Sequence, residues 1–219
     1  MRDRLAEIHR RLKERYGPVR NPHGSLGPMD NLVLTILSQN TNDVLRDRAF
    51  KNLKKLVSRW EEVLRLPDGR LEEAIRPAGL AEQKAGTIRR AVARVVSERG
   101  EADLSFLRGM DPEDAYRYLR EIKGVGDKTA SIVLLFSFGF PFFPVDTHIQ
   151  RVTKRLGIAP PSHTPEKIRR DVEPHLKRGM HVPLHVNIIR LGRELCKPKN
   201  PLCSECPLKD LCDFGGGKK

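Results

Sequence analysis

The chain has 219 residues, enough for one large domain or two small ones around a real hydrophobic core. Lys and Arg outnumber Asp and Glu by 41 to 28, and the net charge of +13 favours a nucleic acid or another anionic surface as partner, although a merely basic protein would share it. The longest apolar run, residues 132–145, is broken by Gly139, Pro141 and Pro144 and is too short for a membrane span, and no apolar signal-peptide core is visible. We therefore expect a cytoplasmic protein with no membrane partner.

Apolar residues at helical spacing predict helices along the first half of the chain. The first covers residues 3–16, with Leu5, Ile8 and Leu12 on one face. Asp30 is expected to cap the next helix, which runs into the polar segment 38–43. Further helices are expected at residues 44–58, 60–66 and 71–75, followed by a long one between Leu80 and Gly100.

Capping residues mark the helices of the second half. Asp111 and Pro112 begin a helix with Ala115, Tyr118, Leu119 and Ile122 inward, and a second begins near Asp127 with Ala130, Val133, Leu134 and Ser137 inward. Asp146, Thr164 and Pro183 are expected to begin the remaining helices. No stretch alternates as a strand does, so the predicted fold class is all-α.

The turn Gly124-Val125-Gly126 joins two of these helices. Two glycines around one apolar residue permit a tight turn and a close backbone approach to a ligand, and the following helix N-terminus suits a phosphate. A nucleotide-binding P-loop is excluded, because Asp127 and Ile122 stand where it needs glycine. A dinucleotide fingerprint is excluded because a helix, not a strand, precedes the turn. A helical corner without a ligand remains open.

All four cysteines cluster near the C-terminus with the spacing C-x6-C-x2-C-x5-C, formed by Cys196, Cys203, Cys206 and Cys212. In a cytosolic chain such a cluster indicates a metal site more than disulfides. Zinc is possible, but zinc sites usually repeat the C-x2-C pair that occurs once here. An iron–sulfur cluster accepts four unevenly spaced cysteines. His181 and His185 are also spaced as a pair, but Pro183 is expected to start the helix between them, and we assign them no metal.

The segment Lys-Gly-Val-Gly-Asp-Lys-Thr-Ala, residues 123–130, followed by Val-Asp-Thr-His at 145–148, resembles the helix-hairpin-helix DNA glycosylases. The endonuclease III branch is the most similar, and the cysteine spacing resembles that branch's iron–sulfur loop. The similarity runs from about Leu26 to Cys212. It implies a [4Fe–4S] cluster on the four cysteines and double-stranded DNA with damaged bases or abasic sites as the partner.

The resemblance also implies a two-lobed fold with the iron–sulfur loop at 196–212. A central helical lobe would span 24–140 and contain the helix-hairpin-helix at about 112–137. Residues 1–23 would return to pack with 141–219 as the second lobe. The substrate cleft would lie between the lobes, with Lys128 and Asp146 facing it from opposite sides.

Lys128 matches the catalytic lysine of family members that also cut the strand. A lysine in the first turn of a helix is disfavoured by the helix dipole, so its pKa should fall if the site is also partly dry. A neutral amine forms Schiff bases. Asp146 is expected to cap its helix in any case, and the resemblance adds the role of the family's catalytic aspartate, which helps deprotonate Lys128 and stabilises positive charge on the sugar.

The remaining site residues are expected to touch DNA. When a base is flipped out, side chains must fill the hole, and the family alignment puts Asn40 at this position, where Gln is common; Gln39 precedes it. Leu80 matches the leucine that wedges at the opposite strand. Backbone and phosphate contacts are expected from the hairpin, the start of the next helix and the cysteine loop: Gly124, Val125, Gly126, Thr129, His148, Lys197 and Lys199. For His148 a structural role is the alternative.

Together these features predict a bifunctional DNA N-glycosylase and AP lyase of base excision repair that removes oxidised pyrimidines. We expect it to act as a monomer, associated with the nucleoid of a prokaryotic cell. A mismatch thymine or uracil glycosylase on the same scaffold is one alternative. The other is a non-catalytic helix-hairpin-helix DNA-binding module, against which Lys128 and Asp146 together argue.

Overall fold

The computed structural model describes residues 1–216, and every regular element within them is a helix. The expected all-α fold class is therefore confirmed. The chain divides into two compact units: a central unit, His23–Phe140, and a terminal unit, Met1–Pro22 with Pro141–Lys219, whose residues 217–219 lie outside the described part. Within residues 1–216 no helix is both long and apolar enough to cross a membrane.

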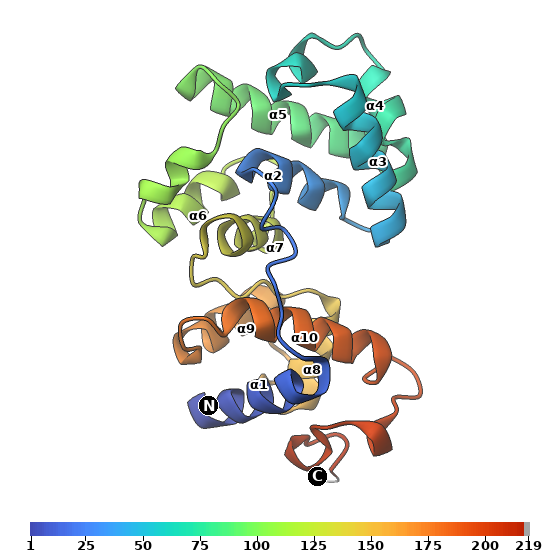
Figure 1. The fold of residues 1–219 in the computed structure, drawn as a ribbon, viewed down its shortest axis with the longest axis vertical. Coiled ribbons are helices and arrows are strands. Elements are labelled where there is room, and N and C mark those ends of the chain that lie inside the picture. Colours follow the sequence, from blue (N-terminus) through green and yellow to red (C-terminus); the bar gives the residue numbers. More distant parts are fainter. Residues whose placement is uncertain (217–219) are drawn as a thin grey trace. The chain divides into compact units, whose positions relative to one another are not determined.

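The central unit packs its helices around α2, which is buried at every residue from Asn31 to Leu37 (Figure 1). A helix that is apolar on all sides belongs in a core, and α2 contacts α3, α5 and α7. The elements of this unit are α2 (Pro28–Leu37), α3 (Asp43–Leu56), α4 (Arg70–Ile75), α5 (Ala81–Arg99), α6 (Pro112–Arg120) and α7 (Asp127–Val133), with the 3-10 helices η1 (Trp60–Arg65), η2 (Arg76–Ala78) and η3 (Ser105–Gly109) and the π-helix η4 (Leu134–Phe138).

The terminal unit combines both ends of the chain in one core. Leu5, Ile8 and Leu12 of the N-terminal helix are buried in a single apolar cluster with Ile188 and Leu191 from near the C-terminus. The N-terminal helix therefore packs with the C-terminal part of the chain. The elements are α1 (Arg2–Tyr16), α8 (Thr147–Arg155), α9 (Pro165–Val172) and α10 (His181–Glu194), with the 3-10 helices η5 (Glu173–His175), η6 (Cys203–Glu205) and η7 (Lys209–Leu211).

Three helix starts follow the capping chemistry expected from sequence. The side chains of Asp111, Asp146 and Thr164 each accept a hydrogen bond from a backbone N–H of the first helical turn. Such bonds form between residues close in sequence, which explains why the sequence alone locates them.

Two predicted helix starts are wrong. Gly27 and not Asp30 caps α2, with Pro28 as the first helical residue; Asp30 instead accepts a hydrogen bond from Trp60 Nε1 at 3.0 Å. α10 begins at His181 and not at Pro183. Proline is tolerated within the first turn of a helix, because the N–H groups there have no intrahelical partner.

Two details of the hairpin helices also differ from the prediction. Tyr116 is buried on α6 and Tyr118 only half-buried, so the inward face is rotated slightly from the expected one. α7 ends at Val133 and continues as the π-helix η4, which was expected to be ordinary α-helix. Single π turns inside helices are frequent near functional sites.

Candidate functional site

The turn between α6 and α7 is held by contacts to α5. Gly124 has φ +102°, and a Cβ there would lie 2.2 Å from Thr87 Oγ1, so only glycine fits. Arg90 Nε of α5 donates to the carbonyl oxygen of Lys123 at 3.0 Å, and Val125 is buried beneath the turn. The motif did not reveal Thr87 or Arg90, because nothing in their spacing relates them to the hairpin.

Gly126 has a different role from Gly124. Its φ is −86°, a value open to any residue, and the nearest atom to an added Cβ is the far end of Arg120 at 3.8 Å. Of the two glycines, only Gly124 is therefore required by the backbone.

Lys128 lies in the first turn of α7 with its side chain exposed. The neighbouring carboxylate of Asp127 accepts a hydrogen bond from the Tyr116 hydroxyl at 2.7 Å, which ties the start of α7 to α6. The central unit does not enclose this amine, because the Lys128 side chain is exposed there. Its amine is accessible to a large ligand.

Asp146 caps α8 in the terminal unit. Its Oδ1 accepts a hydrogen bond from the Ile149 backbone N–H at 2.8 Å, and its side chain is half-buried. The carboxylate thus lies at the N-terminus of α8, where the helix dipole is positive. The other carboxylate oxygen is not needed for the cap.

His148, in the first turn of α8, is half-buried. Its Nδ1 lies 3.1 Å from a guanidinium nitrogen of Arg151, which also donates to the carbonyl oxygens of Gly192 and Cys196. These contacts connect α8 to the end of α10 and to the start of the cysteine loop. They support the structural interpretation of His148.

Asn40 and Leu80 stand at the exposed tips of two loops of the central unit, and both have an unusual backbone conformation. Asn40 and Leu80 both have positive φ, 51° and 49°, and Leu80 is 52% exposed. Positive φ is rare for residues other than glycine and Asn, and for leucine it is costly, so surrounding contacts must hold it. Gln39 behaves differently from Asn40: its Nε2 donates to Thr129 Oγ1 at 3.3 Å, and Thr129 is buried. Gln39 thus binds the hairpin, while Asn40 is exposed.

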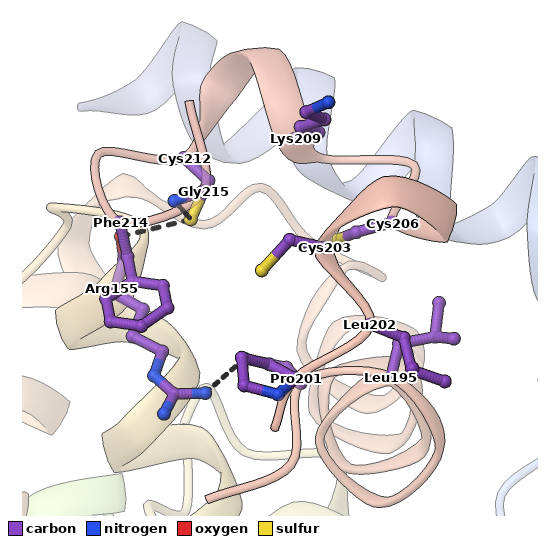
Figure 2. Close-up of a pocket in the computed structure, with 11 residues that line it drawn as sticks. Arg155, Leu195, Pro201, Leu202, Cys203, Cys206, Lys209, Cys212, Phe214 and Gly215 are labelled. Carbon is purple, nitrogen blue, oxygen red and sulfur yellow. Dashed lines mark hydrogen bonds between the residues drawn. The ribbon is translucent and has the colours of Figure 1, made fainter. Parts of the chain in front are cut away.

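The four cysteines line one pocket in the terminal unit (Figure 2). The pocket holds about 300 Å³ of space free of protein atoms, part of it open to solvent. Figure 2 shows the sulfurs of Cys203 and Cys212 facing this space, with the ring of Phe214 beside it. A hollow ringed by four thiols fits a multi-iron cluster, whose ligands spread over several metal atoms.

Burial raises the pKa of the Cys206 thiol, and the nearby thiols of Cys196, Cys212 and Cys203 raise it further. Thiolates crowded together in a partly dry pocket repel one another. The positive charge of bound metal ions offsets this repulsion. The donor set and its enclosure therefore fit an iron–sulfur cluster. Among residues 1–216, no three His, Cys, Asp or Glu side chains surround a single point as ligands of one metal ion would.

Arg155 borders the cysteine pocket. It donates to Cys196 Sγ at 3.3 Å and to the carbonyl oxygen of Lys197 at 2.7 Å, and its guanidinium lies over the Phe214 ring. The carbonyl oxygen of Arg155 also accepts from the Cys212 thiol at 3.2 Å. The end of α8 thus fixes the loop, while the side chains of Lys197 and Lys199 remain exposed on it.

The N-terminal helix holds the other side of the loop. Arg11 of α1 forms an ion pair with Asp210 at 2.5 Å and donates to the carbonyl oxygen of Pro207. Arg4 donates to the carbonyl oxygen of Leu211 at 2.7 Å and pairs with Asp213. Sequence periodicity gave no sign of these contacts, because they join residues at opposite ends of the chain.

His181 and His185 share one face of α10, contrary to the expected separation, because the helix begins before Pro183. Both are buried, and His185 Nδ1 lies 3.0 Å from the carbonyl oxygen of Pro144. Burial lowers the pKa of His181. These features are those of core histidines.

Comparison with known proteins agrees with these features. Residues 33–178 match the model of the HhH-GPD superfamily base excision DNA repair proteins, and residues 196–212 match the iron–sulfur binding domain of endonuclease III. Endonuclease III of Thermotoga maritima is 33% identical over 210 residues, which cover 96% of this chain and 92% of that protein. The chain belongs to the endonuclease III family.

Two further comparisons extend this result. Endonuclease III of Bacillus subtilis is 32% identical over 188 residues, covering 86% of this chain and 82% of that protein. A structure of a trapped endonuclease III–DNA covalent intermediate superposes with a TM-score of 0.84 at 25% identity, covering 100% of this chain and 98% of that one. This endonuclease III homologue is therefore a base excision DNA glycosylase that binds DNA and carries an iron–sulfur cluster on its C-terminal loop.

Proposed function

We propose that the enzyme is bifunctional, removing oxidised pyrimidines from double-stranded DNA and then cutting the strand at the abasic site. The observation that carries this proposal is Lys128, an accessible amine in the first turn of α7 directly after the hairpin. Its place in the motif matches the lysine of strand-cutting family members. The similar solved structure is of an endonuclease III trapped covalently on DNA, which supports covalent chemistry here as well.

In the proposed reaction the Lys128 amine attacks C1′ of the flipped nucleotide. The N–C1′ bond forms while the glycosidic bond breaks, and the base leaves with that electron pair and takes up a proton. Opening of the sugar ring gives a protonated imine, which makes the C2′ protons acidic. Loss of one C2′ proton shifts an electron pair toward C3′ and expels the 3′ phosphate. Hydrolysis of the imine then returns the free lysine.

We give Asp146 the part of the family's catalytic aspartate. A carboxylate at a helix N-terminus can stabilise positive charge that develops on the sugar as the base departs. One oxygen serves the helix cap, so the other is free to act on a substrate without cost to the fold.

DNA contacts are proposed for three regions. The hairpin, with Gly124, Val125, Gly126 and Thr129, would contact the sugar–phosphate backbone, and exposed Lys197 and Lys199 would contact further phosphates. Asn40 would fill the space left by the flipped base, and Leu80 would wedge at the opposite strand. The exposure of Asn40 and the attachment of Gln39 to Thr129 support Asn40 over Gln39 in this role.

The iron–sulfur cluster, for which we propose the [4Fe–4S] form, would be held by Cys196, Cys203, Cys206 and Cys212. When bound, it supplies a rigid crosslink and no step of the reaction. The protein's own part is to keep the loop closed, through Arg155 on one side and Arg4 and Arg11 on the other. We further propose that the enzyme acts as a monomer.

An oligonucleotide panel tests this proposal directly. Duplexes with thymine glycol, dihydrouracil, uracil, a G·T mismatch or an abasic site are incubated with the enzyme, with and without borohydride. We expect cutting of the oxidised pyrimidines and abasic site, and a reduced covalent complex on the DNA. Lys128→Gln should bind these duplexes yet neither cut nor be trapped. Lys123→Gln, an exposed lysine of the same hairpin, is the matched control and should be trapped like the wild type.

Trapping of Lys128→Gln at the wild-type level would make another amine the nucleophile. The second candidate function is a mismatch thymine or uracil glycosylase on the same scaffold. Asn40 departs from the usual Gln at the hole-filling position, and this departure bears on which lesions the enzyme accepts. Faster cutting of the uracil or G·T duplex than of the oxidised pyrimidines would favour that function.

A further inference from the structure

Lys84 on α5 is the most completely buried lysine of the described chain, with 1% of its surface exposed. Its ammonium donates hydrogen bonds to the carbonyl oxygens of Leu37 at 2.9 Å and Ala78 at 2.7 Å. A buried charge is costly unless hydrogen-bonded, so a lysine in this position needs an explanation beyond solubility. Its two acceptors come from separate parts of the chain.

Both acceptors stand at helix ends. Leu37 is the last residue of α2, and Ala78 is the last residue of η2. Carbonyls at helix C-termini lack intrahelical partners and bear partial negative charge, which suits an ammonium. The Lys84 side chain therefore caps the C-terminal ends of both helices.

The two helix ends lead directly into the two exposed tips. Asn40 follows Leu37 after two intervening residues, and Leu80 follows Ala78 after one. The carbonyl oxygen of Leu80, the N-cap of α5, accepts the first backbone hydrogen bond of that helix, from the Lys84 N–H at 3.0 Å; this bond does not depend on the lysine side chain. Leu80 is thus fixed by bonds before and at its own position, which accounts for the persistence of its positive φ.

Burial lowers the pKa of Lys84, while the two carbonyl oxygens stabilise the ammonium. The lysine ammonium has three donor hydrogens and can bind both carbonyl oxygens at once. An apolar side chain of equal length, such as Met, would leave both acceptors without this partner. The bonds have good length for a charged donor, and bonds of this type are stronger than neutral ones.

We propose that Lys84 is a positioning residue for base extrusion. By binding the carbonyl oxygens of Leu37 and Ala78, it fixes the positions of Asn40 and Leu80 relative to each other, so that both can insert into the duplex. This inference rests on the proposed function, because it assumes that the two tips enter the base stack. Lys84 itself would touch no DNA, since it is buried beneath both loops. Its effect should therefore pass entirely through the residues at the tips.

The test compares two substrates that differ in their need for insertion. A thymine glycol duplex requires extrusion of a stacked base, whereas an abasic site in a single strand has no stack to open. We expect Lys84→Met to lower kcat/KM on the duplex on the order of tenfold or more, from the loss of two charge-assisted bonds, and to leave single-strand cutting within about twofold of wild type. Lys84→Gln, which retains one donor group, should have a kcat/KM on the duplex between those of Lys84→Met and the wild type. Val92→Ala, a core change on the same helix, is the control for general loss of stability.

Coupling to the tip distinguishes positioning from mere stability. In a Leu80→Ala background the further loss caused by Lys84→Met should shrink to about twofold or less, because the element it positions is gone. An undiminished loss in that background, or an equal loss on both substrates, would overturn the proposal. If Lys84→Met does not fold, the same comparison is made with Lys84→Gln. Failure of the wild type to cut either substrate would instead refute the proposed function and is separately visible.

Discussion

At the scale of single residues, Asp146 combines a cap with a proposed chemical role, and one substitution can separate them. The cap uses one side-chain oxygen as acceptor from Ile149 N–H, and an amide oxygen accepts such a bond about as well as a carboxylate. Negative charge, by contrast, is available only from the carboxylate. Asn at this position therefore preserves the geometry and removes the charge.

We expect Asp146→Asn to keep the wild-type melting temperature within a few degrees and to lose most glycosylase turnover. Circular dichroism melting and single-turnover assays on the thymine glycol duplex measure the two effects. Asp111→Asn, the same change at the cap of α6, is the matched control and should leave turnover unchanged. Full turnover by Asp146→Asn would reduce Asp146 to its capping role.

At the scale of elements, α5 organises the exposed parts of the central unit. Thr87 packs against Gly124 of the hairpin turn and Arg90 binds the carbonyl oxygen of Lys123, while Lys84 joins the ends of α2 and η2. In Figure 1 this helix crosses the upper part of the central unit. The hairpin turn and the helix ends that precede Asn40 and Leu80 therefore all contact α5.

The two hairpin glycines should respond differently to alanine. Gly124→Ala forces a side chain into a positive-φ position against Thr87 and should cost about 1–3 kcal/mol of unfolding free energy. It should also weaken binding to every DNA sequence alike, because the turn is expected to contact the backbone. Gly126→Ala, with φ of −86° and open space, should cost about 1 kcal/mol or less.

Urea unfolding and fluorescence-anisotropy titration with several unrelated duplexes measure these effects. Equal losses for both alanine variants would show that the shape of the turn does not depend on Gly124. Loss of binding confined to one sequence would instead indicate that the hairpin reads bases.

The iron–sulfur loop is the second element with a distinct prediction. Cys203→Ala should abolish the visible absorption and the iron content of the purified protein, and should make the loop susceptible to proteolysis, because ligand binding and local folding are coupled. Ser204→Ala, the exposed neighbour, is the control and should retain both. Metal analysis of the wild type that finds zinc and no iron would contradict the cluster assignment.

At the scale of the whole molecule, the net charge of +13 sets the strength of non-specific attraction to DNA. Each phosphate neutralised by Lys or Arg releases counterions, so affinity falls with salt in proportion to the number of contacts. We expect affinity for an undamaged duplex to fall by at least about tenfold between 50 and 200 mM salt.

Lys197→Gln should make the slope of log affinity against log salt concentration shallower by about one, and Lys199→Gln should do the same. Lys13→Gln on α1, to which we give no DNA contact, is the control that removes equal charge. Binding that does not vary with salt would mean that charge plays no part in DNA recognition by this enzyme.

The sequence by itself determined what depends on neighbours along the chain. Helix caps at Asp111, Asp146 and Thr164 join residues two or three apart, and the inward faces of α1 and α8 follow from apolar spacing. The cysteine spacing indicated a metal loop for the same reason. Even here the local rules failed at two positions. Asp30 does not cap α2 but accepts a hydrogen bond from Trp60 Nε1, and α10 begins before Pro183 because the first turn of a helix tolerates proline.

Tertiary structure alone decided which residues act together across the chain. Lys84 looks like one more surface lysine in a basic sequence, and only packing buries its ammonium between the ends of α2 and η2. The same holds for Thr87 beneath Gly124 and for Arg4 and Arg11 against the cysteine loop. Such contacts join residues far apart in sequence, where neither helical periodicity nor local capping chemistry carries any signal. The physical reason is that long-range partners are selected by the shape and charge of the assembled core.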